Sequence, residues 1–169
     1  MLFEAHSSDY QTPQALADLV QDGFGILKVG SGLTFALREA LYGLDHIADV
    51  LFLEHTSVRG TMEALMQQKP QHWAKYYQGT ALHQHLQRHY SYSDRIRYYW
   101  TDPVAGPAVA DLMALFGEAD IPEPLISQYL GAAYGDVMTG KTAKTAPALL
   151  RAEIMRALTP YFDACYGAD

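Results

Sequence analysis

Two short runs near the start of the chain decide its fold: LFEAHSSDY at residues 2–10 and FGILKVG at residues 24–30. Both are rich in residues that favour strands, and the segment between them, TPQALADLVQDG, predicts a helix. Thr12 suits the N-cap of that helix, Pro13 its first position and Gly23 its exit. Strand, helix and strand in this order predict part of a parallel α/β unit, whose chemistry gathers where the strands end.

Beyond these runs the sequence predicts helices rather than further strands. Apolar residues recur at helical spacing from Leu33 to Leu51, and Thr61 predicts the N-cap of a helix that Pro70 ends. Two more helices are expected over 105–116 and 149–165, where Pro160 is a site for a kink. The small polar stretch GAAYGDVMTGKTAKTAP, at residues 131–147, predicts a loop.

Composition restricts the class of protein. The chain has 169 residues, of which 49% are hydrophobic and 18% charged, and this suits one soluble domain. A net charge of -7 argues against a nucleic-acid partner, because phosphate backbones demand a basic surface. The single cysteine, Cys165, rules out an internal disulfide, and no signal region or membrane-length apolar run is present. We therefore expect a cytoplasmic protein without a membrane partner.

Glu4 and His6 are the first candidates for chemistry. They lie two residues apart on a predicted strand, so their side chains share one face. They could act as a general base with an orienting acid, or as two ligands of a divalent metal. The structural alternative is a Glu–His hydrogen bond that holds a loop. Asp9, in the turn that follows, could shape the turn or contact a substrate.

Lys28 and the turn after it form a second candidate group. A lysine near the end of a strand could bind a sugar phosphate or form a Schiff base, or it could only extend its amine into solvent. The following GSGLT, which contains Ser31 and Gly32, places backbone N–H groups at a helix start, where anions bind. A turn of small residues that allows close packing explains the same letters.

The window SYSDRIRYYW, at residues 91–100, joins Arg95 and Arg97 to several aromatic residues. Arginines beside rings suit phosphate or sugar recognition, an aromatic dock for the helical tail, or a subunit contact. From composition alone we favour the aromatic dock or the subunit contact over phosphate or sugar recognition. His83, His85 and His89 do not all share one helical face, which favours a surface cluster over a metal site.

Four segments in order, FEAHSSDYQTP, ILKVGSGLTFALREAL, YSYSDRIRYYW and LISQYL, resemble the non-catalytic subunit family of class II D-tagatose-1,6-bisphosphate aldolase. The family is also catalogued under the name tagatose-6-phosphate kinase. The resemblance covers essentially the whole chain but only the C-terminal portion of the family. Gly23, Ser31 and Gly131 stand where the family tends to have histidine, proline and proline, respectively.

The resemblance implies an α/β fold: the last two βα units of a TIM-type (β/α)8 barrel, at residues 1–56, and a mainly helical extension at 57–169. The two parts would pack as one structural domain. It also implies an accessory subunit that supports the activity and stability of a zinc-dependent aldolase partner in galactitol, tagatose or amino-sugar breakdown. The first barrel strands are absent from this chain, and exposed strand edges lead us to expect an oligomer.

Two other functions remain open. A ketohexose-phosphate C4 epimerase would interconvert fructose 6-phosphate and tagatose 6-phosphate, and an inactive fragment would have no activity. The catalytic candidates are Glu4, His6 and Lys28, with Glu4 and His6 also the candidates for a divalent metal. The candidates for binding the sugar or its phosphate are Asp9, Ser31, Gly32, Arg95 and Arg97. A kinase is not expected, because TGKTAK around Lys141 lacks the first glycine of a phosphate loop and a preceding strand.

Overall fold

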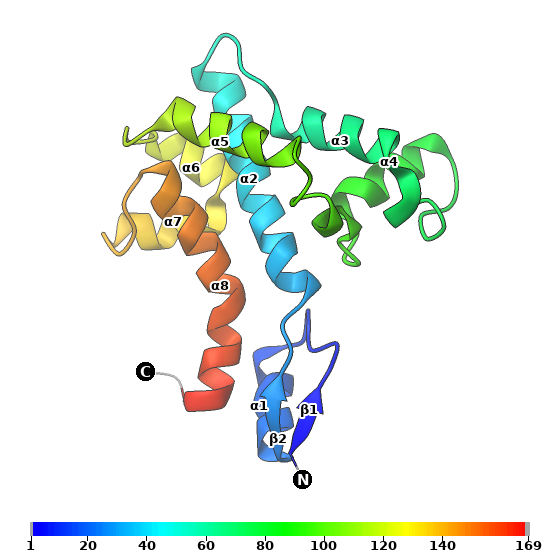
Figure 1. Cartoon of the computed structure of the whole chain (residues 1–169). Helices are drawn as coiled ribbons and strands as arrows, with labels where there is room; N and C mark the ends of the chain where they lie inside the picture. The colour runs from blue at the N-terminus through cyan, green and yellow to red at the C-terminus, as the bar shows by residue number, and fades with distance from the viewer. Residues whose placement is uncertain (1, 168–169) are drawn as a thin grey trace.

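The computed structural model describes residues 2–167, and most of them lie in helices (Figure 1). In chain order the elements are β1 (Phe3–Ala5), α1 (Pro13–Gln21), β2 (Phe24–Leu27), α2 (Ser31–Leu51), α3 (Val58–Gln68), the 3-10 helix η1 (Pro70–His72), α4 (Ala81–Tyr90), the 3-10 helix η2 (Arg95–Tyr98), α5 (Ala105–Phe116), α6 (Glu123–Tyr129), α7 (Gly131–Met138) and α8 (Ala146–Tyr166).

The first three elements, β1, α1 and β2, form what we call the base. The two strands pair in parallel, with Glu4 opposite Ile26. Between them α1 begins as predicted: the Thr12 hydroxyl accepts a hydrogen bond from the amide of Ala15 at 3.1 Å. Gly23 follows the helix with a φ of +92°, which glycine adopts without strain. The predicted α/β beginning is therefore confirmed, whereas two strands do not establish a barrel, and its TIM-type form stays a proposal.

Two long helices connect the base with the other helices. Helix α2 has 21 residues and rises from the base through the centre of the molecule (Figure 1). Helix α8, also of 21 residues, runs back beside α2 and reaches α1. At its lower end the Tyr161 hydroxyl donates a hydrogen bond to the carbonyl of Ser8 at 2.9 Å. The end of the chain therefore holds the loop that follows the first strand.

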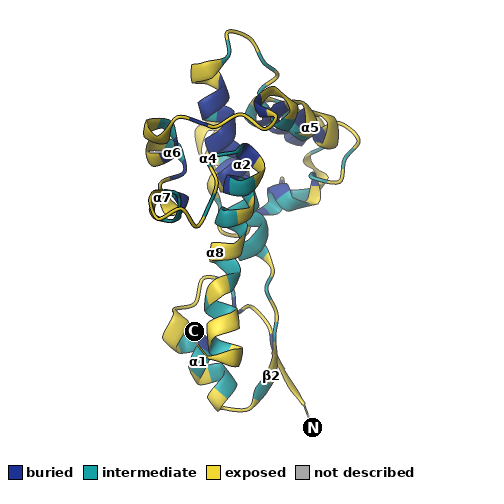
Figure 2. Ribbon diagram, turned by 90° about the vertical axis from the view of Figure 1, so that its left-hand side faces the viewer, coloured by how far each residue is buried: buried dark blue, intermediate teal, exposed yellow. Residues whose placement is uncertain are grey.

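The remaining helices, α3 to α7, surround the upper parts of α2 and α8, and we call this part the body. Its buried residues form one apolar core, shown dark blue in Figure 2, whereas most of the base is partly or fully exposed. Helix α2 contributes Leu44 and Ile47, both completely buried. Gly43 lets the end of α6 approach α2: a Cβ there would lie 2.5 Å from Cδ2 of Leu130 and 2.6 Å from the carbonyl oxygen of Tyr129.

Two predictions were wrong, the start of one helix and one loop, and contacts with distant residues contribute to both. Helix α3 begins at Val58 and not near Thr61, because the Ser57 hydroxyl accepts from the amide of Gly60 at 3.1 Å and Asp45 of α2 accepts from the amide of Val58 at 2.9 Å. Helix α7 lies within the predicted loop, where the amide of Ala133 donates to Glu153 of α8 at 2.9 Å. Helix 105–116 is confirmed, and 149–165 forms the larger part of α8.

The proposed division at residues 1–56 and 57–169 stays a prediction. Helix α2 follows β2 and runs into the body, and α8 packs on both α2 and α1, so these two helices join the base to the body. Among residues 2–167, no helix combines the length and the hydropathy that crossing a bilayer requires.

Candidate functional site

The strand-end cluster, which we define as Glu4, His6 and Lys28, lies at the carboxyl ends of β1 and β2. Because Glu4 pairs with Ile26, the side chains two residues further along each strand, His6 and Lys28, fall on the same side. Lys28 forms an ion pair with Glu4, and Nε2 of His6 lies 3.2 Å from the same carboxylate oxygen. The structure thus brings together the three residues predicted as catalytic, although their chemical roles stay predictions.

The charge balance of this cluster favours an ionised carboxylate. The hydrogen bond from Lys28 is the largest influence and, with the charges of Lys28 and His6, holds the pKa of Glu4 below its usual range. The Lys28 and His6 side chains are 54% and 68% exposed, so solvent and ligands can reach them. A hollow of about 400 Å³ borders Glu4 and His6. The cluster therefore presents a carboxylate and an imidazole to this hollow, with the Lys28 ammonium paired to the carboxylate.

Asp9 occupies the N-terminus of α2. Its Oδ1 accepts hydrogen bonds from the amides of Gly30 and Gly32, at 2.9 and 2.8 Å. A carboxylate is favourable there, because unpaired amides and the helix dipole attract negative charge. The predicted phosphate-binding turn of Ser31 and Gly32 therefore already holds an anionic group of the protein. A phosphate would have to share these amides with Asp9 or displace it.

The loop between β1 and α1 is held in an unusual conformation. Ser7 and Tyr10 have φ values of 57° and 62°, in the left-handed region that side chains other than glycine rarely adopt. The Tyr10 hydroxyl donates to the carbonyl of Tyr92 at 2.9 Å, and the two rings lie 4.6 Å apart. Strain of this kind persists only where surrounding contacts enforce it, and it gathers at functional sites.

The same aromatic segment also anchors the beginning of α2. The Thr34 hydroxyl donates to Oδ2 of Asp94 at 2.6 Å, and Nε of Arg38 lies 3.5 Å from Oδ1. Arg38 is only 2% exposed and lies over the Phe35 ring at 4.0 Å. Burial raises the pKa of Asp94, an effect that Thr34 and Arg38 oppose. This segment therefore fastens the loops around the strand ends to the body.

Arg95 and Arg97 point toward other partners. Arg95 donates to the carbonyl of His72 and lies 3.4 Å from the centre of the Tyr76 ring. Arg97 donates to the Tyr98 hydroxyl at 2.9 Å. Within residues 2–167, no ion pair or hydrogen bond joins either arginine to the strand-end cluster. Both arginines stack on rings of neighbouring segments, Tyr76 and Tyr98, while the aromatic dock for the helical tail and the binding of phosphate stay predictions.

Glu4 and His6 supply two of the three or four ligands that zinc takes. Lys28 already neutralises the carboxylate, and an ammonium group cannot coordinate a metal. Among the described residues, Glu4 and His6 belong to no group of three histidine, cysteine or acidic side chains with ligand atoms close together. A metal at this pair would thus need further ligands, and the site stays a prediction.

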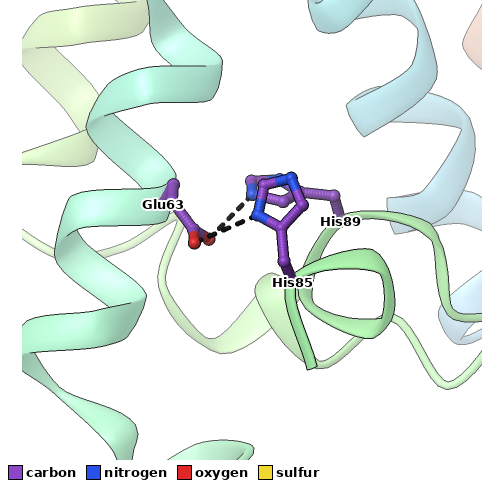
Figure 3. Close-up of side chains that lie close together, drawn as sticks. All are labelled: Glu63, His85 and His89. Carbon is purple, nitrogen blue, oxygen red and sulfur yellow. Dashed lines mark hydrogen bonds and ion pairs between the residues drawn. The ribbon is translucent and has the colours of Figure 1, made fainter. Parts of the chain in front are cut away.

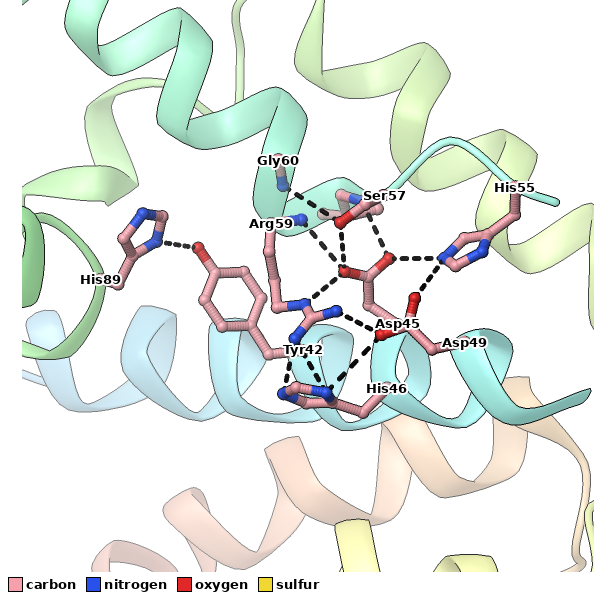
Figure 4. A network of polar contacts seen from close by, with 10 residues as sticks. Tyr42, Asp45, His46, Asp49, His55, Ser57, Arg59, Gly60 and His89 are labelled. Carbon is pink, nitrogen blue, oxygen red and sulfur yellow. Dashed lines mark hydrogen bonds and ion pairs between the residues drawn. The ribbon is translucent and has the colours of Figure 1, made fainter. Parts of the chain in front are cut away.

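Sequence reasoning missed a buried polar network in the body, drawn in Figure 4. Asp45 of α2 is fully buried and accepts bonds from the Ser57 hydroxyl at 2.8 Å, the Val58 amide at 2.9 Å and the Arg59 Nε at 2.6 Å. Burial tends to raise the pKa of Asp45, but these bonds outweigh it and lower the pKa. The spacing of α2 showed Asp45 only as a polar position, because its partners lie in another helix.

The fold and the strand-end cluster define a class: a helical body joined to a small parallel α/β base that carries charged side chains at its strand ends. The family model described as D-tagatose-1,6-bisphosphate aldolase subunit GatZ/KbaZ-like matches residues 1–166. The chain belongs to this family, as its four sequence segments predicted.

A solved structure extends the comparison. The crystal structure described as a probable tagatose 6 phosphate kinase from Sinorhizobium meliloti 1021 is 56% identical in sequence, with a TM-score of 0.95. The match covers 98% of this chain but 43% of that one. The chain thus spans less than half the length of this relative, which shares its fold over the matched part.

Proposed function

We propose that this chain acts in an accessory subunit of a class II tagatose-1,6-bisphosphate aldolase, in the breakdown of galactitol, tagatose or amino sugars. The observation that carries the proposal is the family match across residues 1–166. On this proposal, the zinc and the cleavage of the sugar bisphosphate belong to the catalytic partner. This chain contributes stability and a binding surface.

The test is to incubate a class II catalytic subunit with and without this chain. We expect the partner alone to cleave tagatose 1,6-bisphosphate, to lose activity faster on warming, and to be protected by this chain. The Sinorhizobium meliloti relative is the matched longer control. Protection by neither protein would contradict the accessory role.

A ketohexose-phosphate C4 epimerase is the second candidate, and the strand-end cluster favours it. A carboxylate, an imidazole and an ammonium on one face, beside a hollow of about 400 Å³, can move protons and hold an anionic sugar. Inversion at C4 without an oxidant requires a retro-aldol step: a base takes the proton of the C4 hydroxyl, the C3–C4 bond breaks to give an aldehyde and an enediolate, and the bond re-forms on the opposite face of the aldehyde while the proton returns to the C4 oxygen. Glu4 or His6 would take and return that proton, and Lys28 would hold the negatively charged oxygens of the enediolate.

Incubation with fructose 6-phosphate tests this candidate directly. We expect formation of tagatose 6-phosphate that His6→Ala and Lys28→Ala abolish. His83→Ala and Lys75→Ala, which replace residues of the body, are the matched controls. Absence of turnover by both this chain and the longer relative would exclude the epimerase. Turnover by the relative alone would favour the third candidate, an inactive fragment.

The inactive-fragment hypothesis draws on the small sheet. Phe3 and Ile26 are 53% and 42% exposed, and two strands leave unpaired edges. We expect this chain alone to oligomerise or to unfold readily. A sharply melting monomer in sedimentation and thermal unfolding would contradict this expectation.

The kinase description given to the relative finds no support in the residues of this chain. Thr139–Lys144 follows α7 as a turn, and the amides of Lys141 and Thr142 donate to the carbonyl of Asp136 at 2.8 and 3.1 Å. These amides are thus occupied within the chain and do not cradle a phosphate in the manner of a phosphate loop.

A further inference from the structure

Three side chains with metal-ligand chemistry meet in the body, away from the strand ends (Figure 3). Glu63 comes from α3, and His85 and His89 come from one face of α4, four residues apart. Nδ1 of His85 lies 3.1 Å from Oε1 of Glu63, and Nε2 of His89 lies 2.9 Å from Oε2. One ligand atom from each residue lies within 4.8 Å of the others.

These separations suit one small divalent ion. Zinc binds imidazole nitrogen and carboxylate oxygen at about 2.0–2.2 Å, so neighbouring atoms of a tetrahedral site lie about 3.3 Å apart. The two observed separations are a few tenths of an ångström shorter and end on different oxygens of Glu63. Rotation of the exposed His85 side chain would lengthen the first, and a small shift of the Glu63 carboxylate would lengthen the second.

His89 also has the support that metal-binding histidines generally have. Its other ring nitrogen, Nδ1, lies 2.5 Å from the hydroxyl of Tyr42, and both side chains are buried. A hydroxyl both donates and accepts, so Tyr42 can pair with either tautomer of the ring. With a metal on Nε2, Nδ1 carries the proton and donates it to Tyr42, which fixes the orientation of the ring.

The cluster is open on one side. A hollow of about 340 Å³ is lined by Glu63, His85 and His89 together with Tyr42, Arg59 and Tyr90. Three protein ligands and a water molecule from this hollow would complete four-coordinate geometry. An ion could thus enter without unfolding the helices.

Arg88 is the opposing charge in this region. It donates through Nε to Oε2 of Glu63 at 2.8 Å and through Nη2 to Oε1, and it lies 4.7 Å from the Trp73 ring. Gln67 donates to Oε1 as well, at 2.6 Å, so both carboxylate oxygens have protein partners, and a metal would have to share Oε2 with Arg88. Arg88 lowers the affinity by charge repulsion while it holds the carboxylate in place.

We infer that Glu63, His85 and His89 form a binding site for zinc or a similar divalent metal ion, which cross-links α3 to α4. The inference goes beyond the proposed aldolase role, because it concerns the body and requires neither substrate nor partner. The helices are already held together by the Glu63–Arg88 pair. The ion adds a cross-link whose strength follows the zinc concentration.

Titration of the purified whole chain with zinc chloride, followed by calorimetry and by thermal unfolding, tests the site. We expect one zinc ion per chain and a melting temperature that rises with zinc. Cobalt in place of zinc should give the visible absorption of a tetrahedral centre. His85→Gln should weaken zinc binding about tenfold or more, because it removes a ligand with little effect on the packing.

His83→Gln is the matched control, since His83 lies on the same helix but outside the cluster. It should leave zinc affinity unchanged. Arg88→Gln should raise the affinity about tenfold, because it removes a neighbouring positive charge. Equal zinc affinity in the wild type, His85→Gln and Arg88→Gln would show an adventitious ion only and overturn the inference.

Discussion

The base and the body are stabilised in different ways. Residues of the body form one apolar core in which Leu44, Ile47 and Leu149 are fully buried. Within the described chain, β1, α1 and β2 contribute nothing to that core, and their fully buried apolar side chain is Leu16, at 1% exposure. The base is held by the packing of α1 on α8 and by polar links: Asp9 to α2, Tyr10 to Tyr92 and Tyr161 to Ser8.

This difference indicates where each kind of mutation acts. Burial of apolar surface supplies most of the free energy of folding, so changes in the body should act on stability. The strand-end cluster is exposed and contributes little to packing, so its changes should act on binding or chemistry. A strand-end variant that lowers stability, or a body variant that changes only binding, would show that the two parts depend on each other more than their packing indicates.

The largest expected loss comes from Asp45→Ala in the body. The change leaves Arg59 without its buried partner and two amides of α3 without an acceptor, so it should cost about 3–5 kcal/mol in the free energy of unfolding. Urea unfolding followed by circular dichroism measures it. Asp49→Ala removes a more exposed partner of Arg59, at 2.5 Å, and should cost about 1 kcal/mol or less. Equal losses of unfolding free energy in the two variants would contradict our inference that Asp45 is the main buried partner of Arg59.

Acid should unfold the body through the same carboxylate. The pKa of Asp45 is lower in the folded protein than its ordinary value of about 4, so the unfolded chain takes up the proton first. Its contribution is therefore fully present above about pH 4–5 and is lost as the pH falls through the folded-state pKa. Unfolding free energies measured from pH 7 to pH 3 should fall less steeply for Asp45→Asn than for the wild type.

Replacing one glycine in each part by alanine adds a single methyl group and tests how tightly each part is packed. Gly43→Ala in the body would push a Cβ to 2.6 Å from the Tyr129 carbonyl oxygen, which belongs to the backbone, and should cost about 1–3 kcal/mol. Gly25→Ala in β2 would contact the end of the Leu2 side chain, which is exposed and can move. Its melting temperature should remain near that of the wild type, and a large drop would show that the sheet packs more tightly than we infer.

Tyr161→Phe should have a smaller effect, centred on the base. It removes the hydrogen bond to the Ser8 carbonyl and should cost about 1 kcal/mol. Hydrogen exchange should show faster exchange in residues 6–12 and little change in α3 to α5. Uniformly faster exchange would indicate that α8 stabilises both parts through this one contact.

The smallest effect on stability is expected for Lys28→Met. Its ion pair with Glu4 is exposed, and such pairs contribute little after solvent screening. The melting temperature should not change measurably, and any effect should appear in sugar-phosphate binding measured by calorimetry. Lys75→Met is the control, since that lysine lies in the body over the Tyr76 ring.

Local signals predicted the elements whose causes are local. Thr12, Pro13 and Gly23 set the limits of α1, and apolar spacing predicted α2 and α5. The start of α3 was missed because Asp45, 13 residues before Val58, holds its first amides. The pairing of Tyr10 with Tyr92, 82 residues apart, left no trace in either local pattern.

The candidate sites also differ in whether local sequence patterns or contacts between distant residues bring their side chains together. Strand periodicity placed Glu4 and His6 on one face, whereas Lys28 was a separate candidate that only the family resemblance joined to them; in the structure the parallel pairing brings all three together. For His85 and His89 the sequence favoured a surface cluster over a metal site, because His83 does not share their helical face. Glu63 comes from a different helix, so sequence spacing alone could not connect it with either histidine.

The bond between Tyr161 and Ser8 joins residues 153 positions apart, and this separation sets the order in which the molecule can be completed during synthesis. A ribosome makes the strand-end loop long before the part of α8 that holds it. Until that helix emerges, β1 and β2 have their unpaired edges and no support from α8. The nascent chain is therefore most open to wrong pairing, or to capture by a chaperone, at the place where its candidate chemistry lies.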